Sequence, residues 1–225
     1  MSWNPLWETV YQSRPWGQYP GEDVIRFVAG HFYQVPDRSK VRLLEVGCGA
    51  GANLWFMARE GFCVHGVEGS ATAARLATER LDRECPGWQQ AGGQVHAADM
   101  ARLPYPDGCF DAVLDVVSAC YSTLAQARQT YAELARVTRA GGKLFVRTFA
   151  SGCWGEGTGT EEESGMWACT EGPLQGLGPT RFTAREQIDD LLQGWQLDRL
   201  ERDTHSNADG SQAIVHWVVH AIRQP

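Results

Sequence analysis

The stretch "LLEVGCGAGANLW", residues 43–55, places three glycines within five positions directly after an apolar run. A short apolar segment that ends at glycines is typical of a buried parallel strand that turns into a helix. Such a turn brings backbone N–H groups close to a ligand at the N-terminus of the helix. The segment therefore predicts a nucleotide-binding loop, and it leaves open which nucleotide the loop binds.

The chain on both sides of this turn alternates between strand and helix patterns, which implies βαβ crossovers. We expect an α/β fold with a doubly wound, seven-stranded, mostly parallel sheet that ends with an antiparallel strand. The turn "NADG" separates the last two strands and suits a hairpin. The expected strands are 41–46, 62–69, 94–99, 110–118, 142–150, 195–203 and 213–223. The expected helices are 20–32, 51–61, 70–81, 125–140 and 183–195.

With 225 residues and 43% hydrophobic content, the chain can bury the core of one domain. We expect a helical and aromatic lid segment over residues 1–35 and a cofactor-binding core over 41–149. An insertion over 151–179 precedes a closing helix and β-hairpin over 180–225. The insertion is rich in glycine and acidic residues but also contains Trp154 and Trp167. It is therefore either a flexible surface loop or a lid over a site.

The composition argues against several classes of partner. A net charge of −7 with no cluster of Lys and Arg disfavours nucleic acid. The seven cysteines never form a CxxC pair, which favours reduced thiols in a cytoplasmic protein and gives no metal-ligand pattern. No apolar run approaches the roughly 20 residues of a membrane span, and the first residues lack a secretion signal pattern. We expect a cytoplasmic monomer or homodimer without a membrane partner.

The glycine turn fits two templates. Read from Gly47 to Ala52 as G-x-G-x-x-A, it could hold the pyrophosphate of NAD(P), as in an oxidoreductase. Read as E-x-G-x-G-x-G from Glu45 to Gly51, it resembles the first motif of the class I S-adenosylmethionine-dependent methyltransferases. A carboxylate at Glu45 would repel a pyrophosphate but could accept hydrogen bonds from an ammonium group. The second template is therefore favoured.

Further segments extend the resemblance over residues 41–149. Glu68 closes the next expected strand 17 residues after Gly51, where a carboxylate can bind ribose hydroxyls of either nucleotide. "AADMARLPYPDGCFDAVLD" (97–115) and "ELARVTRAGGKLFV" (133–146) resemble later motifs of the same methyltransferases, which usually carry Pro where Ala140 stands. By this resemblance Asp99 would accept the adenine amino group, and Met100 would pack on the ring.

The resemblance implies S-adenosyl-L-methionine as cofactor, S-adenosyl-L-homocysteine as product and a Rossmann-like fold. The expected cofactor-binding residues are Glu45, Gly47, Cys48, Gly49, Gly51, Asn53, Glu68, Gly69, Ser70, Asp99, Met100 and Asp115.

Candidates for the acceptor side follow the fourth strand and precede the first helix. Tyr121 occupies a position where many relatives carry histidine, so it is a candidate catalytic base or a contact residue. Asp115 is equally consistent with a strand residue bonded to neighbouring backbone. The N-terminal segment is dense in aromatic residues, which either staple the first helix or wall the site. The expected substrate or lid residues are Tyr11, Arg14, Trp16, Tyr19, Trp154 and Trp167.

The sequence thus predicts methyl transfer to O or N of a small-molecule metabolite by in-line displacement. A protein-directed methyltransferase and a non-catalytic S-adenosylmethionine-binding module stay open as alternatives, and an NAD(P)-dependent oxidoreductase is less favoured. The sequence does not distinguish O- from N-methylation, and it does not name the acceptor.

Overall fold

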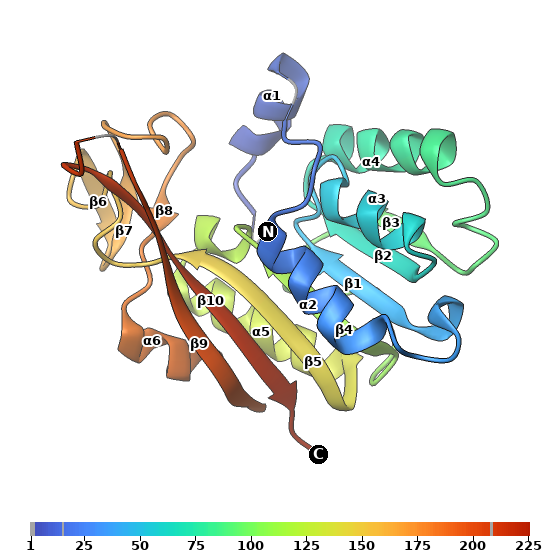
Figure 1. The fold of residues 1–225 in the computed structure, drawn as a ribbon. Helices are drawn as coiled ribbons and strands as arrows, with labels where there is room; N and C mark the ends of the chain where they lie inside the picture. The colour runs from blue at the N-terminus through green and yellow to red at the C-terminus, as the bar shows by residue number, and fades with distance from the viewer. Residues whose placement is uncertain (1–2, 15, 208) are drawn as a thin grey trace.

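The structure, a computed structural model, describes residues 3–14, 16–207 and 209–225. Ala208 of the predicted hairpin turn, and residues 1, 2 and 15 of the predicted lid segment, lie outside these ranges. Figure 1 shows one sheet with helices on both faces and the N-terminal segment above one end of the sheet.

The main sheet has seven strands in the order β3-β2-β1-β4-β5-β10-β9. The first five of these pair in parallel, and β10 is antiparallel to both β5 and β9. The predicted fold class is therefore confirmed. The strands are β1 (Arg42–Val46), β2 (Cys63–Glu68), β3 (Gln94–Ala97), β4 (Phe110–Val116), β5 (Thr138–Phe149), β9 (Trp195–Ser206) and β10 (Ala213–Arg223).

Helices cover both faces of this sheet, so each face carries its own apolar core (Figure 1). Side chains of α2, α3 and α4 pack into one core, and side chains of α5 and α6 pack into the other. The helices are α1 (Leu6–Ser13), α2 (Glu22–Phe32), α3 (Ala52–Arg59), α4 (Ala71–Glu84), α5 (Leu124–Val137) and α6 (Arg185–Leu191). Two short 3-10 turns are η1 (Arg38–Lys40) and η2 (Ala119–Tyr121).

Local chemistry explains where the helices begin and end. Ser70 caps α4 by accepting a hydrogen bond from the N–H of Ala73, as the sequence predicted. The predicted extension of the helix over 125–140 to residue 140 is wrong, because this helix, α5, ends at Val137. Thr138 stops it by donating its hydroxyl to the carbonyl of Leu134 at 2.6 Å, and the chain then enters β5.

The insertion after β5 is folded, which the sequence did not indicate. It forms a small antiparallel sheet of β6 (Thr160–Glu163), β7 (Met166–Ala168) and β8 (Thr180–Arg181). Its apolar residues share a core with the end of β5 and with Val10 of α1. Figure 1 shows this small sheet beside the start of β10, across from α1.

Candidate active site

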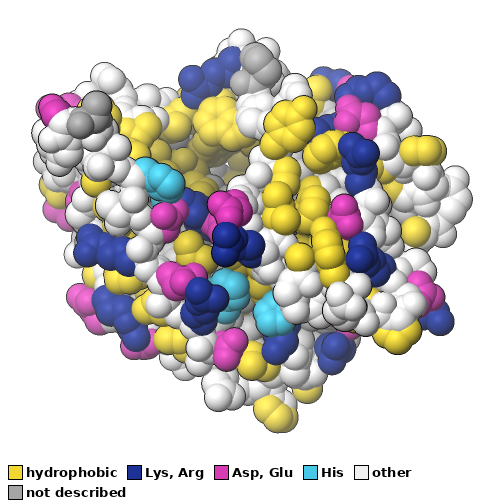
Figure 2. Space-filling view, in the orientation of Figure 1, with side chains coloured by type: hydrophobic (Ala, Val, Ile, Leu, Met, Phe, Trp, Pro, Cys, Tyr) yellow, Lys and Arg dark blue, Asp and Glu magenta, His cyan; other side chains and the backbone are white. Residues whose placement is uncertain are grey.

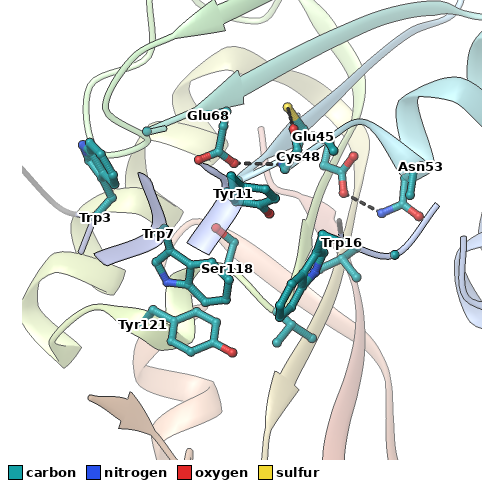
Figure 3. A pocket seen from close by; sticks show the side chains of 18 of the residues that line it. Trp3, Trp7, Tyr11, Trp16, Glu45, Cys48, Asn53, Glu68, Ser118 and Tyr121 are labelled. Atoms are coloured by element: carbon teal, nitrogen blue, oxygen red, sulfur yellow. Dashed lines mark hydrogen bonds between the residues drawn. The ribbon is translucent and has the colours of Figure 1, made fainter. Parts of the chain in front are cut away.

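A cavity opens at the carboxyl ends of β1, β2 and β4, where a doubly wound sheet places its ligands. Its walls come from the glycine turn, from the residues after β4 and from the N-terminal segment. The space-filling view shows a hollow beside the N-terminal segment with hydrophobic side chains around it (Figure 2). Figure 3 shows the side chains that line the cavity.

The glycine turn approaches its neighbours too closely for any side chain. Gly47 and Gly49 have φ values of +60° and +52°, which L-residues rarely adopt. A Cβ on Gly47 would lie 1.7 Å from the hydroxyl oxygen of Ser118, and one on Gly49 would lie 2.4 Å from that of Tyr11. Both glycines therefore expose backbone to the cavity, whereas Gly51 packs against Ala77 of α4.

Glu45 is a buried carboxyl at the end of β1. Its Oε1 accepts a hydrogen bond from the amide of Asn53 at 2.5 Å, whereas its Oε2 is buried without a partner among the described residues (Figure 3). Burial raises the pKa of Glu45 to about 8, although the Asn53 bond acts in the opposite direction. A cationic donor would satisfy the unpaired oxygen and stabilise the ionised form. The side chain therefore fits an ammonium group.

Glu68 closes β2 on the same cavity. Its Oε2 accepts from the N–H of Gly49 and its Oε1 from the N–H of Ser70, both at 2.8 Å. Burial raises its pKa, and these backbone donors oppose that shift. Gly69 also donates a backbone hydrogen bond to this carboxylate. Because each carboxylate oxygen can accept two hydrogen bonds, Glu68 retains capacity for a further hydroxyl donor.

The N-terminal segment is anchored over the start of α4 by Glu8. Its carboxylate accepts from the hydroxyls of Ser70 and Thr72 at 2.6 and 2.5 Å. Trp3 lies against Gly69, since a Cβ there would come within 2.3 Å of the indole. The segment thereby brings Trp3, Trp7 and other aromatic residues onto the cavity wall.

Glu8→Gln is expected to loosen α1 from α4 at neutral pH. The hydroxyl bonds lower the pKa of Glu8 to about 2, so its contribution to stability is full above pH 4.5. This contribution is lost as the pH falls from 4.5 toward 2. The protection factors of residues 6–13, which are corrected for the intrinsic pH dependence of amide exchange, should therefore fall in the variant at pH 7 and in the native chain only near pH 3. The control is Glu22→Gln, which changes an exposed residue of α2. Equal protection of residues 6–13 at pH 7 in the native chain, in Glu8→Gln and in Glu22→Gln would contradict the anchor.

The wall after β4 is formed by an unusual turn. Val117 has φ of +56°, which strains a β-branched residue. Asp115 stabilises this turn, because its Oδ1 accepts hydrogen bonds from the N–H groups of Ser118 and Ala119 at 3.0 and 3.2 Å. Its other oxygen accepts from the hydroxyl of Tyr131 at 2.8 Å. Asp115 therefore supports the turn and does not line the cavity.

Arg181 holds the far end of the same turn. The side chain is fully buried, and its Nη1 donates to the carbonyls of Ala119 at 3.1 Å and Ser122 at 2.6 Å. The insertion thus reaches under η2, whose last residue, Tyr121, lines the cavity. Sequence reasoning missed Arg181, because no local pattern marks a residue that acts on carbonyls some 60 residues earlier.

Arg181→Met is expected to lower the free energy of unfolding by about 2–4 kcal/mol, because buried carbonyls of η2 lose their charged donor. Urea denaturation measures this change. Arg185→Met removes an exposed arginine of α6 that pairs with Asp189 and should cost about 0–1 kcal/mol. Similar costs for the two variants would show that Arg181 does not hold the turn.

The cavity gathers twelve of the residues that the sequence singled out. These are Tyr11, Trp16, Tyr19, Glu45, Gly47, Cys48, Gly49, Asn53, Glu68, Gly69, Met100 and Tyr121. The cavity is also lined by four residues that were not predicted from the sequence as site residues: Trp3, Trp7, Val117 and Ser118. The density of tryptophan near the N-terminus was the available signal for the first two.

Seven predicted residues lie outside the cavity lining: Arg14, Gly51, Ser70, Asp99, Asp115, Trp154 and Trp167. Arg14 is exposed, with its guanidinium 5.1 Å from the Trp16 ring centroid. Asp99 accepts a hydrogen bond from the N–H of Ala101, and its contact with an adenine stays a prediction. Trp154 and Trp167 belong to the insertion, none of whose described residues line this cavity, so the structure does not support the lid interpretation.

Comparison with known proteins identifies the glycine-turn half of the chain. Residues 44–146 match the family model described as a methyltransferase domain. These residues form a methyltransferase domain. The predicted methyltransferase family is thereby confirmed for these residues.

Relatives of this methyltransferase domain are known from curated sequences and solved structures. The demethylmenaquinone methyltransferase of Tropheryma whipplei (strain Twist) is 32% identical over 108 residues. The match covers 48% of this chain and 41% of that protein, so the chain spans less than half the length of the curated relatives it matches.

Two solved structures share the fold. A S-adenosylmethionine-dependent methyltransferase from Methanosarcina mazei has a TM-score of 0.68 and 19% identity, over 86% of this chain and 96% of that one. The 1,6-didemethyltoxoflavin-N1-methyltransferase of Burkholderia thailandensis, with 1,6-didemethyltoxoflavin and S-adenosylhomocysteine bound, has a TM-score of 0.63 and 16% identity, over 91% of this chain and 78% of that one.

Among the described residues no helix is both long and apolar enough to cross a membrane.

Proposed function

We propose that this protein transfers a methyl group from S-adenosylmethionine to a small molecule. The observation that carries the proposal is the unpaired, buried Oε2 of Glu45 at the end of β1. A carboxylate in this position fits the ammonium group of an amino-acid-bearing nucleotide and repels the pyrophosphate of a dinucleotide. The methyltransferase domain around it supports the same assignment.

Different residues of the cavity bind different parts of this cofactor. Glu45 binds the ammonium group, and the backbone of Gly47 and Gly49 lets the ligand approach the turn. Glu68 binds a ribose hydroxyl with its remaining acceptor capacity. Met100 packs against the base. When bound, the cofactor supplies a methyl carbon on a positively charged sulfur, so the protein mainly orients both reactants and excludes water.

The enclosure of the cavity favours a small acceptor. Trp7, Tyr11, Trp16 and Tyr19 line the cavity from the N-terminal segment, which Glu8 ties to α4. Trp7 and Tyr11 are half-buried and Trp16 and Tyr19 are exposed at the rim, and a wall of this kind leaves room for a compact molecule. The named relatives are consistent with this class, since demethylmenaquinone and 1,6-didemethyltoxoflavin are small molecules.

Calorimetric titration tests the proposed cofactor. S-adenosylmethionine should bind and NADH should not, and Glu68→Ala should weaken binding of S-adenosylmethionine by about 1–3 kcal/mol, because a ribose hydroxyl loses its buried acceptor. The matched control is Glu186→Ala, an exposed carboxylate on α6. Unchanged affinity in Glu68→Ala would remove Glu68 from the ribose site.

Product analysis separates an enzyme from a binding module. Incubation with S-adenosylmethionine and a metabolite extract should release S-adenosylhomocysteine together with a methylated small molecule. Binding without any such product, or product only with added protein substrates, would contradict the proposed reaction.

A further inference from the structure

Four aromatic rings line the cavity, and we call them the aromatic wall: Trp7, Tyr11, Trp16 and Tyr121. Tyr11 reaches Gly49 of the glycine turn with its hydroxyl. Trp7 lies at the centre, with ring centroids 4.7 Å from Tyr121, 5.3 Å from Trp16 and 6.0 Å from Tyr11. Trp7 meets Trp16 at 87° and Tyr121 at 67°, so the rings do not stack on one another. The wall therefore presents ring faces in more than one direction. Figure 3 shows Trp7, Trp16 and Tyr121 at one end of the view and Glu45 and Glu68 at the other.

The charges around the cavity have one sign. Among the described residues that line it, the acidic ones are Glu45 and Glu68, and none is Lys, Arg or His. An acceptor carrying a carboxylate or phosphate would find no cationic side chain to pair with among these residues. A positive charge is favoured, because ring faces and carboxylates both attract cations. The acceptor side therefore fits a molecule that is uncharged or becomes positive.

The described lining also offers no group placed to take a proton from the acceptor. Glu45 and Glu68 are bonded to Asn53 and to backbone N–H groups at the glycine turn. The hydroxyls of Tyr11 and Tyr121 in the aromatic wall are the other candidates for a base, but burial raises the pKa of both side chains. These phenols stay protonated at neutral pH and cannot act as bases. An alcohol acceptor needs such a base, whereas a neutral amine does not.

We infer that the acceptor atom is the neutral amine nitrogen of an uncharged, ring-bearing small molecule, and that the aromatic wall binds the cation formed on methylation. This inference rests on the proposed function, because it concerns the same cavity. It assigns Tyr121 a contact role through its ring, in place of the base role considered from the sequence.

The charge balance of the transfer suits this wall. The nitrogen lone pair forms the new bond to the methyl carbon, and the electron pair of the broken carbon–sulfur bond stays on sulfur. The sulfur becomes a neutral thioether while the nitrogen gains the positive charge. A tertiary amine keeps that charge, and a primary or secondary amine later loses a proton to water. The positive charge moves from sulfur to nitrogen while the ammonium group on Glu45 is unchanged, so the same ring faces stabilise both states.

Three matched probes test the inference on protein saturated with S-adenosylhomocysteine. Phenyltrimethylammonium mimics a methylated amine, tert-butylbenzene is its uncharged isostere, and 4-tert-butylbenzoate carries a negative charge. Quenching of tryptophan fluorescence gives their affinities. The cation should bind roughly tenfold more tightly than the uncharged isostere, and the benzoate should bind most weakly. Equal affinities, a preference for the benzoate, or no detectable binding of the cation would overturn the inference.

Variants test whether the aromatic wall causes the preference for the cation over its uncharged isostere. Trp7→Leu should lower the ratio of cation to isostere affinity several-fold, because the central ring is lost. Tyr121→Leu should lower it more than Tyr121→Phe, which keeps a ring face and removes only the hydroxyl. A larger loss in Tyr121→Phe than in Tyr121→Leu would contradict a contact through the ring. Circular dichroism confirms that each variant is folded.

The titration with S-adenosylhomocysteine alone separates the two proposals. If this nucleotide does not bind, the proposed function fails before any probe is added. If it binds and the cation is not preferred, only the inferred acceptor class fails.

Discussion

Glu45→Gln is expected to weaken S-adenosylmethionine binding by about 2–5 kcal/mol, the cost of removing one partner of a buried charge pair. The glutamine retains the size of the side chain and an oxygen for the Asn53 amide. It loses the negative charge that the ligand ammonium group needs. Titration calorimetry measures the change, with exposed Glu201→Gln on β9 as the control. An affinity equal to that of the control would overturn the assignment of Glu45.

The same residue makes cofactor binding depend on pH. Burial raises the pKa of Glu45 to about 8, so the unliganded protein carries a proton there at pH 7. Binding of a cation favours the ionised form, so a proton is released and the affinity rises as the pH increases toward 8. Above about pH 8 the ligand amino group itself loses its proton. The affinity should therefore peak near pH 8, and Glu45→Gln should abolish its rise from pH 6 to 8.

The free energy of unfolding of the unliganded protein depends on pH in the opposite direction to cofactor affinity. Between pH 4.5 and 8 the folded chain holds a proton on Glu45 that the unfolded chain has released. The free energy of unfolding therefore falls as the pH rises through this window. Glu45→Gln should flatten that slope, as urea denaturation at pH 5 and pH 8 can show.

Deleting residues 1–19 is expected to reduce turnover on the order of 100-fold or more, because the acceptor loses its wall and water enters the cavity. The domain should stay folded, since Val10 is the buried hydrophobic core residue that the described part of this segment supplies. Circular dichroism and S-adenosylhomocysteine release measure the two effects separately. Normal turnover in a folded truncated protein would show that the segment does not form the acceptor wall.

The sequence alone located the cofactor end of the site because that end depends on local chemistry. Apolar runs specify β1 and β2, and the glycines after β1 permit the positive φ values that the turn requires. Glu45 and Glu68 close their strands, and parallel strands bring their carboxyl ends to one edge of the sheet. The strand-to-helix pattern therefore sufficed to place both carboxyls beside the turn.

The tertiary structure decided the orientation of side chains that act across long separations. Asp115 follows a strand like Glu45 does, but Tyr131 and the η2 backbone bind its carboxylate under the turn. Glu8 binds Ser70, which the sequence had placed in the cofactor site. The bonds of Glu8 to α4 and of Tyr131 to Asp115 have no local signature, because each requires elements distant in the chain to be packed together. The bonds of Asp115 to Ser118 and Ala119 are the contact with neighbouring backbone that the sequence had left open.

The strand alternation, the glycine turn and the two carboxyls could therefore be predicted from the sequence, since each depends on residues a few positions apart. The place of Trp7 among the rings of the aromatic wall and the support of η2 by Arg181 could not. These features join the N-terminal segment, the turn after β4 and the insertion. Only the packing of the whole chain determines which of their side chains meet.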